Sequence, residues 1–554
     1  MEILDVIESI ELCIRVMTEL YAEYSFPDFE VAKTTLLSIK RKLEKLKTQK
    51  ETDSINLIFF QKVLKAIQDS LDMLYETTQD WKGPPEIQED DKFWTDLKKL
   101  ETLDEILIYA ANASKDDLLC LNVSDERWKK LNYVIMHHNY SKRSKTIKHY
   151  KTFFKRTASG WALMSTGLKE KTNIEKKVMV GLGAIYFSIF QSEAVKQAEL
   201  YSAKPRIDIS QTTFNMIDSW MLSKLYNWVI PSIDINKIYH VPRTVSSITS
   251  KEFHSYENDK DSLIAVEKHR VMMRLLRSKN HNSSIKFFGG FCFCAESRKG
   301  KKKQPKKANK LIFHIHGGGY ISMSSASHQV YTRKWANILK IPVISIDYRL
   351  APAHPYPEGL DDVWQAYNWI LNHAEEEYGI TPEKIIVTGD SAGGNFALAL
   401  TYKCILSGIK VPDGLILSYP SLRLDKNFFT PSLLLSLDDF LIPHTLMKLI
   451  VENYLKDSSL DPANDIFISP IAASDEMMKA MPPVRILVGD NDPLQDDCMR
   501  FAEKLLNANG DVKLTIFQGT PHGALNLCFP GGVKESFDVL NQTIAWFEEL
   551  FDYN

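Results

Sequence analysis

Apolar and polar residues recur along this chain with two different periods. In the first half, stretches such as ILDVIESIELCIRVMTELY (3–21) repeat apolar residues at spacings of three and four. That period is typical of amphipathic helices, so we expect residues 1–245 to form an all-helical domain. No motif with evident chemistry lies in this half, and we expect it to serve in docking, covering or regulation.

The second half changes to short apolar runs separated by helical stretches. SIKFFGGFCFCAE (284–296) indicates strands broken at Gly289 and Gly290. Six later runs also predict strands: LIFHIH (311–316), PVISIDY (342–348), KIIVTGD (384–390), GLILSYP (414–420), VRILVGD (484–490) and VKLTIF (512–517). Apolar strands joined by helices predict a mostly parallel sheet covered on both faces, which makes residues 246–554 an α/β domain.

Two segments fall outside this alternation. Residues 430–458 carry an additional helical pattern, and we expect them to cap the carboxyl edge of the sheet, where sites of open α/β sheets form. Residues 298–307 are rich in lysine and arginine. We expect a solvated loop there, with a nuclear signal or an anionic-surface patch as alternatives.

Composition narrows the class of protein. The hydrophobic fraction of 44% and the charged fraction of 25% are those of a soluble globular protein, and a net charge of −2 gives no general attraction to nucleic acid. The seven cysteines include no C-x-x-C pair, which favours reduced thiols over a disulfide framework or a zinc site. The start of the chain lacks a basic leader, and the apolar run at 178–190 is too short to span a bilayer. We therefore expect a cytosolic protein.

The strongest chemical signal is Gly389-x-Ser391-x-Gly393 in IIVTGDSAGGNFALAL (385–400), where Asp390 precedes the serine. A strand pattern comes before it and a helix pattern follows. A serine in such a tight turn needs small neighbours and is held exposed at the top of the sheet, as a nucleophile requires. The structural alternative is a glycine-rich turn without chemistry.

A second signal is His316-Gly317-Gly318-Gly319 at the end of a predicted strand. Glycines let the backbone approach a ligand closely and direct amide groups at it. We expect the amides of Gly317 and Gly318, with that of Ala392 after the nucleophile, to form an oxyanion hole. A phosphate cradle or a plain turn is the alternative, although no Gly-Lys-Ser/Thr follows.

The third signal pairs a histidine with an acid. His522 follows the predicted strand VKLTIF. Four aspartates lie in GDNDPLQDD (489–497), at the end of the earlier predicted strand VRILVGD and just after it. Three of them close that strand or open the next helix (Asp490, Asp496 and Asp497). Asp492 lies in the connecting loop and is best placed to reach His522. A calcium loop is the alternative, but Pro493 breaks its pattern.

Nucleophile, acid and histidine in this order predict covalent acyl transfer. Ser391 attacks an ester carbonyl, His522 takes and returns its proton, and Asp492 orients the imidazole.

The motifs HIHGGGY, SIDYRLAPAHPYPEGLDD, VTGDSAGGN, DNDPLQDD and TPHG resemble, in order and spacing, those of the hormone-sensitive lipase family of α/β-hydrolases. Stretches 161–168, 430–443 and 467–487 extend the resemblance to family members with an N-terminal domain. The resemblance implies a cytosolic neutral lipase and esterase acting on acylglycerols and on cholesteryl or retinyl esters. It implies no metal ion or organic cofactor. Expected partners are these neutral lipids, a lipid-droplet or membrane surface and a second copy of the chain.

The family's nucleophile, acid and base fall on Ser391, Asp492 and His522, and its oxyanion glycines fall on Gly317 and Gly318. The interval between Ser391 and Asp492 is filled by the expected strands, helices and cap, so it leaves no room for the long serine-containing regulatory insertion of the vertebrate adipose enzyme. Two other functions stay open. One is hydrolysis of small soluble esters or amides, and the other is ligand binding on an inactive hydrolase fold, although this chain keeps all three candidate residues.

Overall fold

The computed structural model describes residues 3–24, 27–48, 205–215, 230–242, 270–278, 308–425, 441–456 and 459–552, with the shorter pieces 67–68, 71–72, 74–75, 100, 104, 135–136, 146, 148–154, 194, 430, 432–433 and 439. Contacts divide the chain into two units. The first contains 1–123, 154–206 and 427–446, and the second contains 124–153, 207–426 and 447–554.

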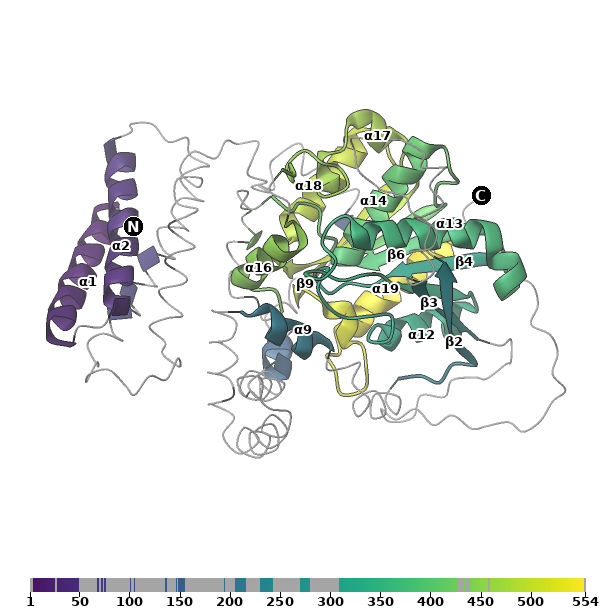
Figure 1. Ribbon diagram of the computed structural model, residues 1–554, viewed down its shortest axis with the longest axis horizontal. Helices are drawn as coiled ribbons and strands as arrows, with labels where there is room; N and C mark the ends of the chain where they lie inside the picture. The colour runs from purple at the N-terminus through teal and green to yellow at the C-terminus, as the bar shows by residue number, and fades with distance from the viewer. Residues whose placement is uncertain are drawn as a thin grey trace, which may run out of the picture. The chain divides into compact units, whose positions relative to one another are not determined.

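The second unit is built on one sheet. Its described strands lie in the order β1-β9-β8-β7-β6-β4-β5-β3-β2 (Figure 1). Their bounds are β1 (Ile135–Met136), β2 (Ile235–Pro242), β3 (Arg270–Arg277), β4 (Ala308–Ile315), β5 (Val343–Asp347), β6 (Ile380–Asp390), β7 (Gly414–Ser418), β8 (Val484–Asn491) and β9 (Val512–Pro521). β2 and β3 run antiparallel to their neighbours, and the other pairs are parallel.

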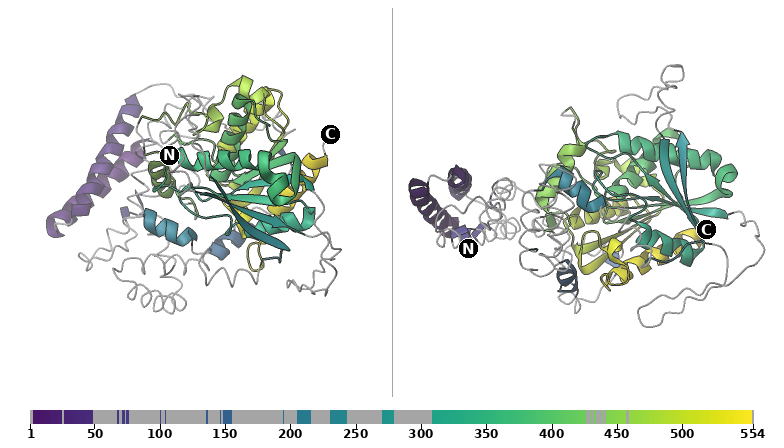
Figure 2. Two further views of the ribbon diagram at one scale, coloured as in Figure 1. Left: turned by 45° about the vertical axis from the view of Figure 1, so that its right-hand side comes forward. Right: turned by 60° about the horizontal axis from the view of Figure 1, so that its bottom comes forward.

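The central strands are apolar because helices cover both faces of the sheet. α12 (Gln329–Leu339) and α19 (Ser536–Asp552) contact each other on one face, whereas α13 (Glu358–Tyr378), α14 (Ala392–Ser407) and α18 (Gln495–Asn507) lie on the other (Figures 1 and 2). Every residue of β7 is buried. The six strands predicted from 311 onward are confirmed, as is the mostly parallel α/β fold.

The structure differs from the predicted boundary near residue 245. β2 pairs along its whole length with β3, and β1 pairs with β9, although both strands lie in the half expected to be helical. The helix α9 (Ile207–Asn215) also belongs to the second unit. Polar residues interrupt the apolar positions of β2, so the sequence INKIYHVP lacks the continuous run that marks a central strand.

The first unit contains α1 (Ile3–Tyr24) and α2 (Pro27–Thr48), which pack against each other. Val6, Ile10, Leu36 and Ile39 are buried, so the helix predicted at 3–21 is confirmed. No helix within the described ranges is long and apolar enough to cross a bilayer. The strands expected at 284–296, the basic segment 298–307 and the apolar run 178–190 lie outside the described residues.

Shorter helices complete the described fold: α16 (His444–Tyr454), η3 (Pro470–Ala472), α17 (Asp475–Lys479) and η4 (Ala524–Leu527). α16 falls within the predicted cap segment 430–458, so part of that segment is helical as expected. Residues 447–454 of this helix belong to the second unit.

Candidate active site

Ser391 lies in a sharp turn between β6 and α14. Its backbone has φ 55° and ψ −119°, a combination that residues other than glycine rarely adopt. Two neighbouring glycines make the turn feasible. A Cβ atom on Gly389 would lie 2.3 Å from the Gly393 carbonyl oxygen, and one on Gly393 would lie 2.1 Å from that of Ile315. The small residues of the motif are therefore needed so that the backbone segments can pass.

Ser391, His522 and Asp492 form one chain of hydrogen bonds. The His522 Nε2 atom lies 2.9 Å from Ser391 Oγ, and Nδ1 lies 2.9 Å from Asp492 Oδ2. Each residue directly follows a parallel strand, β6, β9 and β8 respectively, so the carboxyl ends of the strands bring them together. Asp492 is fully buried, and its other oxygen accepts from the Leu494 amide at 2.9 Å, which fixes the carboxylate.

The four aspartates near residue 490 face different partners. Asp490 accepts from the Gly519 amide at 2.5 Å and thereby ties the end of β8 to β9. Asp497 lies 3.3 Å from Arg423 Nε, and burial raises the pKa of its carboxyl. Asp496 is buried in the first turn of α18. The carboxylates thus point to separate groups, and Asp492 is the one bonded to His522.

The glycine loop differs from the prediction at one residue. The Gly317 amide donates to Asp390 Oδ1 at 3.0 Å, so it is occupied and does not serve as an oxyanion donor. Gly318 and Gly319 adopt positive φ values of 113° and 60°. Within the described part of the chain, the amides of Gly318, Gly319 and Ala392 donate to no acceptor. The candidate oxyanion donors are therefore these three, with Gly319 in place of Gly317.

Aromatic and aliphatic side chains cover this loop. Tyr320 stacks on Tyr454 of α16 with ring centroids 4.0 Å apart, and the Tyr356 amide donates to the Tyr454 carbonyl. A Cβ atom on Gly319 would lie 2.7 Å from the Ile450 Cδ1 atom, so the α16 side chain rests directly on the loop. The part of α16 in the second unit thus packs buried apolar side chains against the loop that carries the candidate donors.

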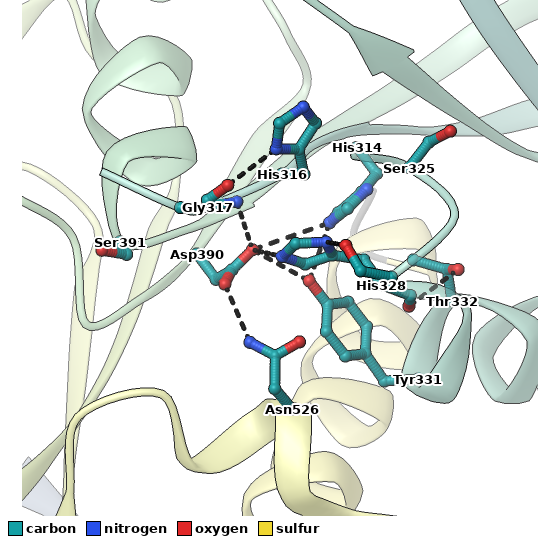
Figure 3. Close-up of polar contacts among 12 residues, drawn as sticks. His314, His316, Gly317, Ser325, His328, Tyr331, Thr332, Asp390, Ser391 and Asn526 are labelled. Atoms are coloured by element: carbon teal, nitrogen blue, oxygen red, sulfur yellow. Dashed lines mark hydrogen bonds and ion pairs between the residues drawn. The ribbon is translucent and has the colours of Figure 1, made fainter. Parts of the chain in front are cut away.

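Residues around Asp390 were not predicted from the sequence. Tyr331 and Asn526 donate to its carboxylate, and His328 lies near it (Figure 3). They come from α12, η4 and the turn before α12, so no local pattern marks them. His316 donates from Nδ1 to the Gly317 carbonyl at 2.7 Å, and burial lowers the pKa of this imidazole to about 3.

The chain is similar to a known family and to proteins named as lipases and esterases. The α/β-hydrolase fold family profile matches residues 312–526. A hormone-sensitive lipase of Bos taurus is 39% identical over 154 residues, which are 28% of this chain and 20% of that protein. An esterase of Acinetobacter venetianus is 34% identical over 248 residues, 45% of this chain and 73% of that protein.

Among solved structures, a hyperthermophilic esterase from the archaeon Pyrobaculum calidifontis aligns with a TM-score of 0.48 at 22% identity. The alignment covers 62% of this chain and 90% of that chain. The aligned residues span a fifth of the length of the bovine relative and nearly three quarters of the bacterial esterase. The chain belongs to the α/β-hydrolase family and is similar to hormone-sensitive lipases over its C-terminal region.

Proposed function

We propose that this protein is a carboxylic ester hydrolase that cleaves neutral lipid esters through a covalent acyl-enzyme on Ser391. The observation that carries the proposal is the hydrogen-bonded chain from Ser391 through His522 to Asp492 at the carboxyl ends of three strands. That arrangement supplies a nucleophile, its general base and the group that orients the base.

In the first half of the reaction, Ser391 Oγ attacks the ester carbonyl carbon while His522 Nε2 accepts the hydroxyl proton. Asp492 accepts from Nδ1, which fixes the tautomer that leaves Nε2 available, and its charge stabilises the imidazolium. His522 then returns the proton to the leaving alcohol. The acyl group stays on Ser391 as an ester.

In the second half, water attacks the acyl carbon while His522 Nε2 accepts its proton. When this intermediate collapses, the bond between the acyl carbon and Ser391 Oγ breaks, His522 returns the proton to Oγ, and the free acid leaves. Both tetrahedral intermediates carry a negative oxygen. The amides of Gly318, Gly319 and Ala392 are the proposed donors to it, and Ala392 also begins α14, whose N-terminal dipole favours negative charge. Loss of one such donor typically costs about 3–4 kcal/mol of barrier.

The lipid part of the proposal is supported by the apolar side chains of Ile450 and Tyr454, which pack against the glycine loop. A long acyl chain gains about 0.8 kcal/mol for each methylene group that it removes from water, so it favours an apolar neighbourhood of this kind. Similarity to proteins named hormone-sensitive lipase points the same way. We propose diacylglycerol, triacylglycerol, monoacylglycerol and sterol or retinyl esters as substrates, met at a lipid-droplet surface in the cytosol.

Rates of hydrolysis by the wild type and by Ser391→Ala test the proposal on two substrates, a short soluble ester and an emulsified diacylglycerol. We expect the wild type to cleave both and the variant to cleave neither. If the wild type cleaves only the short ester, the protein is an esterase of small substrates and the lipase proposal is refuted. If the wild type cleaves neither, or the variant equals it, ester hydrolysis through Ser391 is refuted.

A further inference from the structure

The side chain of Asp390 is buried beside the nucleophile but takes no part in the chain of hydrogen bonds through His522. Its carboxylate accepts from three donors: the Gly317 amide at 3.0 Å, the Tyr331 hydroxyl at 2.9 Å and the Asn526 amide group at 3.2 Å. Figure 3 shows these donors converging on the carboxylate from different directions. An aspartate is rarely buried unless such partners compensate for its lost hydration.

The three donors come from separate parts of the site. Gly317 opens the glycine loop after β4, Asn526 lies in η4 just after His522, and Tyr331 lies on α12. They are 73, 136 and 59 positions from Asp390 along the chain. One carboxylate therefore joins the nucleophile turn to the glycine loop and to the histidine loop.

The surroundings favour the charged form of Asp390. Burial alone would raise the pKa of this carboxyl, but the pKa lies well below its usual value because His328 and His314 face it. Their Nε2 atoms lie 3.4 and 3.9 Å from Oδ1. An ionised carboxylate only accepts hydrogen bonds, which matches the amide, hydroxyl and side-chain amide donors around it.

The contact with Gly317 fixes more than one group. A peptide unit is planar, so holding the Gly317 N–H sets the plane that precedes this residue. The next plane contains the Gly317 carbonyl and the Gly318 N–H, and its carbonyl accepts from His316 Nδ1 at 2.7 Å. A Cβ atom on Gly317 would lie 2.6 Å from Asp390 Oδ2, so the loop rests directly against the carboxylate. The direction of the Gly318 amide depends on both contacts.

We infer that Asp390 is the positioning residue of the oxyanion loop. Its carboxylate holds the Gly317 amide and the Asn526 side chain, so that the amides of Gly318 and Gly319 face the transition state formed at Ser391. The inference rests on the proposed ester hydrolysis. It assigns Asp390 no contact with the substrate, so its effect is on the barrier through the loop.

The test compares wild type, Asp390→Ala, Asp390→Asn and the control Asp413→Ala. Asp413 is a matched control because its carboxylate, like that of Asp390, accepts from a backbone amide. The donor is the amide of Ile385 in β6, at 2.7 Å. Ile385 lies five residues before Asp390 in an extended strand, about 17 Å from the turn. The measurements are kcat and KM for p-nitrophenyl butyrate, the inhibition constant of an alkylboronic acid and the melting temperature. A boronic acid forms a tetrahedral anion on the serine, so its affinity reports on the oxyanion site.

In Asp390→Ala we expect kcat to fall about 30-fold or more and the boronic acid to bind more weakly by a similar factor, because both depend on the same donors. KM should change less than about threefold, since the substrate carbonyl carries little charge. Asp390→Asn keeps one oxygen for the Gly317 amide and should lose only about three- to tenfold in both quantities. Asp413→Ala should lower the melting temperature and leave kcat within about twofold.

The inference is overturned if folded Asp390→Ala keeps wild-type kcat and inhibitor affinity, if its loss lies in KM alone, or if Asp390→Asn is as impaired as Asp390→Ala. Should Asp390→Ala fail to fold, Asp390→Asn decides. Parallel losses of kcat and inhibitor affinity then support the inference, and wild-type values refute it. Failure of the proposed function is distinct, because the wild type itself would then show no Ser391-dependent cleavage.

Discussion

At the scale of single residues, the site combines backbone strain with a buried charge. Ser391 has φ 55°, which costs of order 1–3 kcal/mol for a residue other than glycine. The strain persists because the Ser391 amide donates to the Ser418 carbonyl at 2.9 Å and the glycines around it pack closely. Asp492 is fully buried and has two partners, so its position is equally well determined.

The aspartates that follow β8 give a prediction at this scale. Asp492→Asn should lower kcat by about 10⁴, because the amide favours the wrong tautomer of His522. Asp497→Asn weakens the ion pair with Arg423 but leaves the bond between Asp492 and His522 in place, so its kcat should stay within a few-fold of wild type. Kinetics on a soluble ester measure both. A severe loss in Asp497→Asn with little effect in Asp492→Asn would mean that the acid is misassigned.

At this scale the sequence predicts the three catalytic candidates correctly but assigns one oxyanion glycine wrongly. Order, spacing and turn chemistry singled out Ser391, Asp492 and His522, which the structure brings together. Three consecutive glycines, however, look alike in a sequence. Only the contact with Asp390 shows that the Gly317 amide is occupied. The other Asp390 donors, Tyr331 and Asn526, are distant in the chain and carry no local signal.

At the scale of elements, the ends of β8 and β9 bring the acid and the base together. A Cβ atom on Gly489 would lie 1.8 Å from the Thr520 carbonyl oxygen, so the two strands approach too closely for any side chain there. The Asp490 contact with the Gly519 amide closes the same junction. Asp492 and His522 follow these strand ends directly.

Gly489→Ala should therefore separate the strand ends and damage both stability and catalysis. We expect a loss of about 3 kcal/mol or more in the free energy of unfolding, together with a large fall in kcat. Gly408→Ala is the control, because Gly408 ends α14 with φ 65° and has no heavy atom near its Cβ position. It should cost about 1 kcal/mol and spare kcat. Urea unfolding and ester kinetics measure the pair, and equal effects of the two changes would refute the strand-junction account.

The sequence predicts the central strands of the sheet but not the strands β2 and β3 near one edge. Runs of β-branched residues such as KIIVTGD mark central strands, because a parallel strand is buried on both faces. β3 reads RVMMRLLR, in which Val271 and Met273 are buried while Arg270 is exposed. That alternation suits a strand near the edge of the sheet. The arginines interrupt the apolar run of β3, so its sequence cannot be told from that of an amphipathic helix. β2 was missed for the same reason.

At the scale of the whole molecule, the catalytic unit takes parts from both halves of the sequence. In α9, Gln211 donates to the carbonyls of Ile321 and Ala351 at 2.7 and 3.0 Å, just beyond the glycine loop. Such long-range contacts depend on the folded chain and leave no periodic trace, so the boundary expected near 245 could not anticipate them. Stability of the site is thus a property of the assembled unit.

Buried histidines should make this unit sensitive to acid. Burial lowers the pKa of His314 to about 4 from an ordinary 6.5. The unfolded chain therefore binds a proton below pH 6.5 that the folded protein does not bind until about pH 4, so stability falls as the pH drops through this range. Between pH 6.5 and pH 4, His314 is expected to lower the free energy of unfolding by about 3 kcal/mol.

Melting temperatures between pH 8 and 5 test this contribution of His314 to the pH dependence of stability. His314→Gln should lower stability at pH 8 but show a shallower decline toward pH 5 than wild type. His373→Gln, a change on α13 away from the site, should decline as wild type does. A slope in His314→Gln equal to that of wild type would contradict the assignment.

Detection of the acyl-enzyme tests the central claim most directly. Wild type and Ser391→Ala would be mixed with excess p-nitrophenyl ester, quenched in acid and digested for mass spectrometry. The account predicts a burst of p-nitrophenol stoichiometric with wild-type protein and an acyl mass on the peptide containing Ser391, with neither in the variant. Acyl transfer to another residue, or ester cleavage by the variant at the wild-type rate, would contradict it.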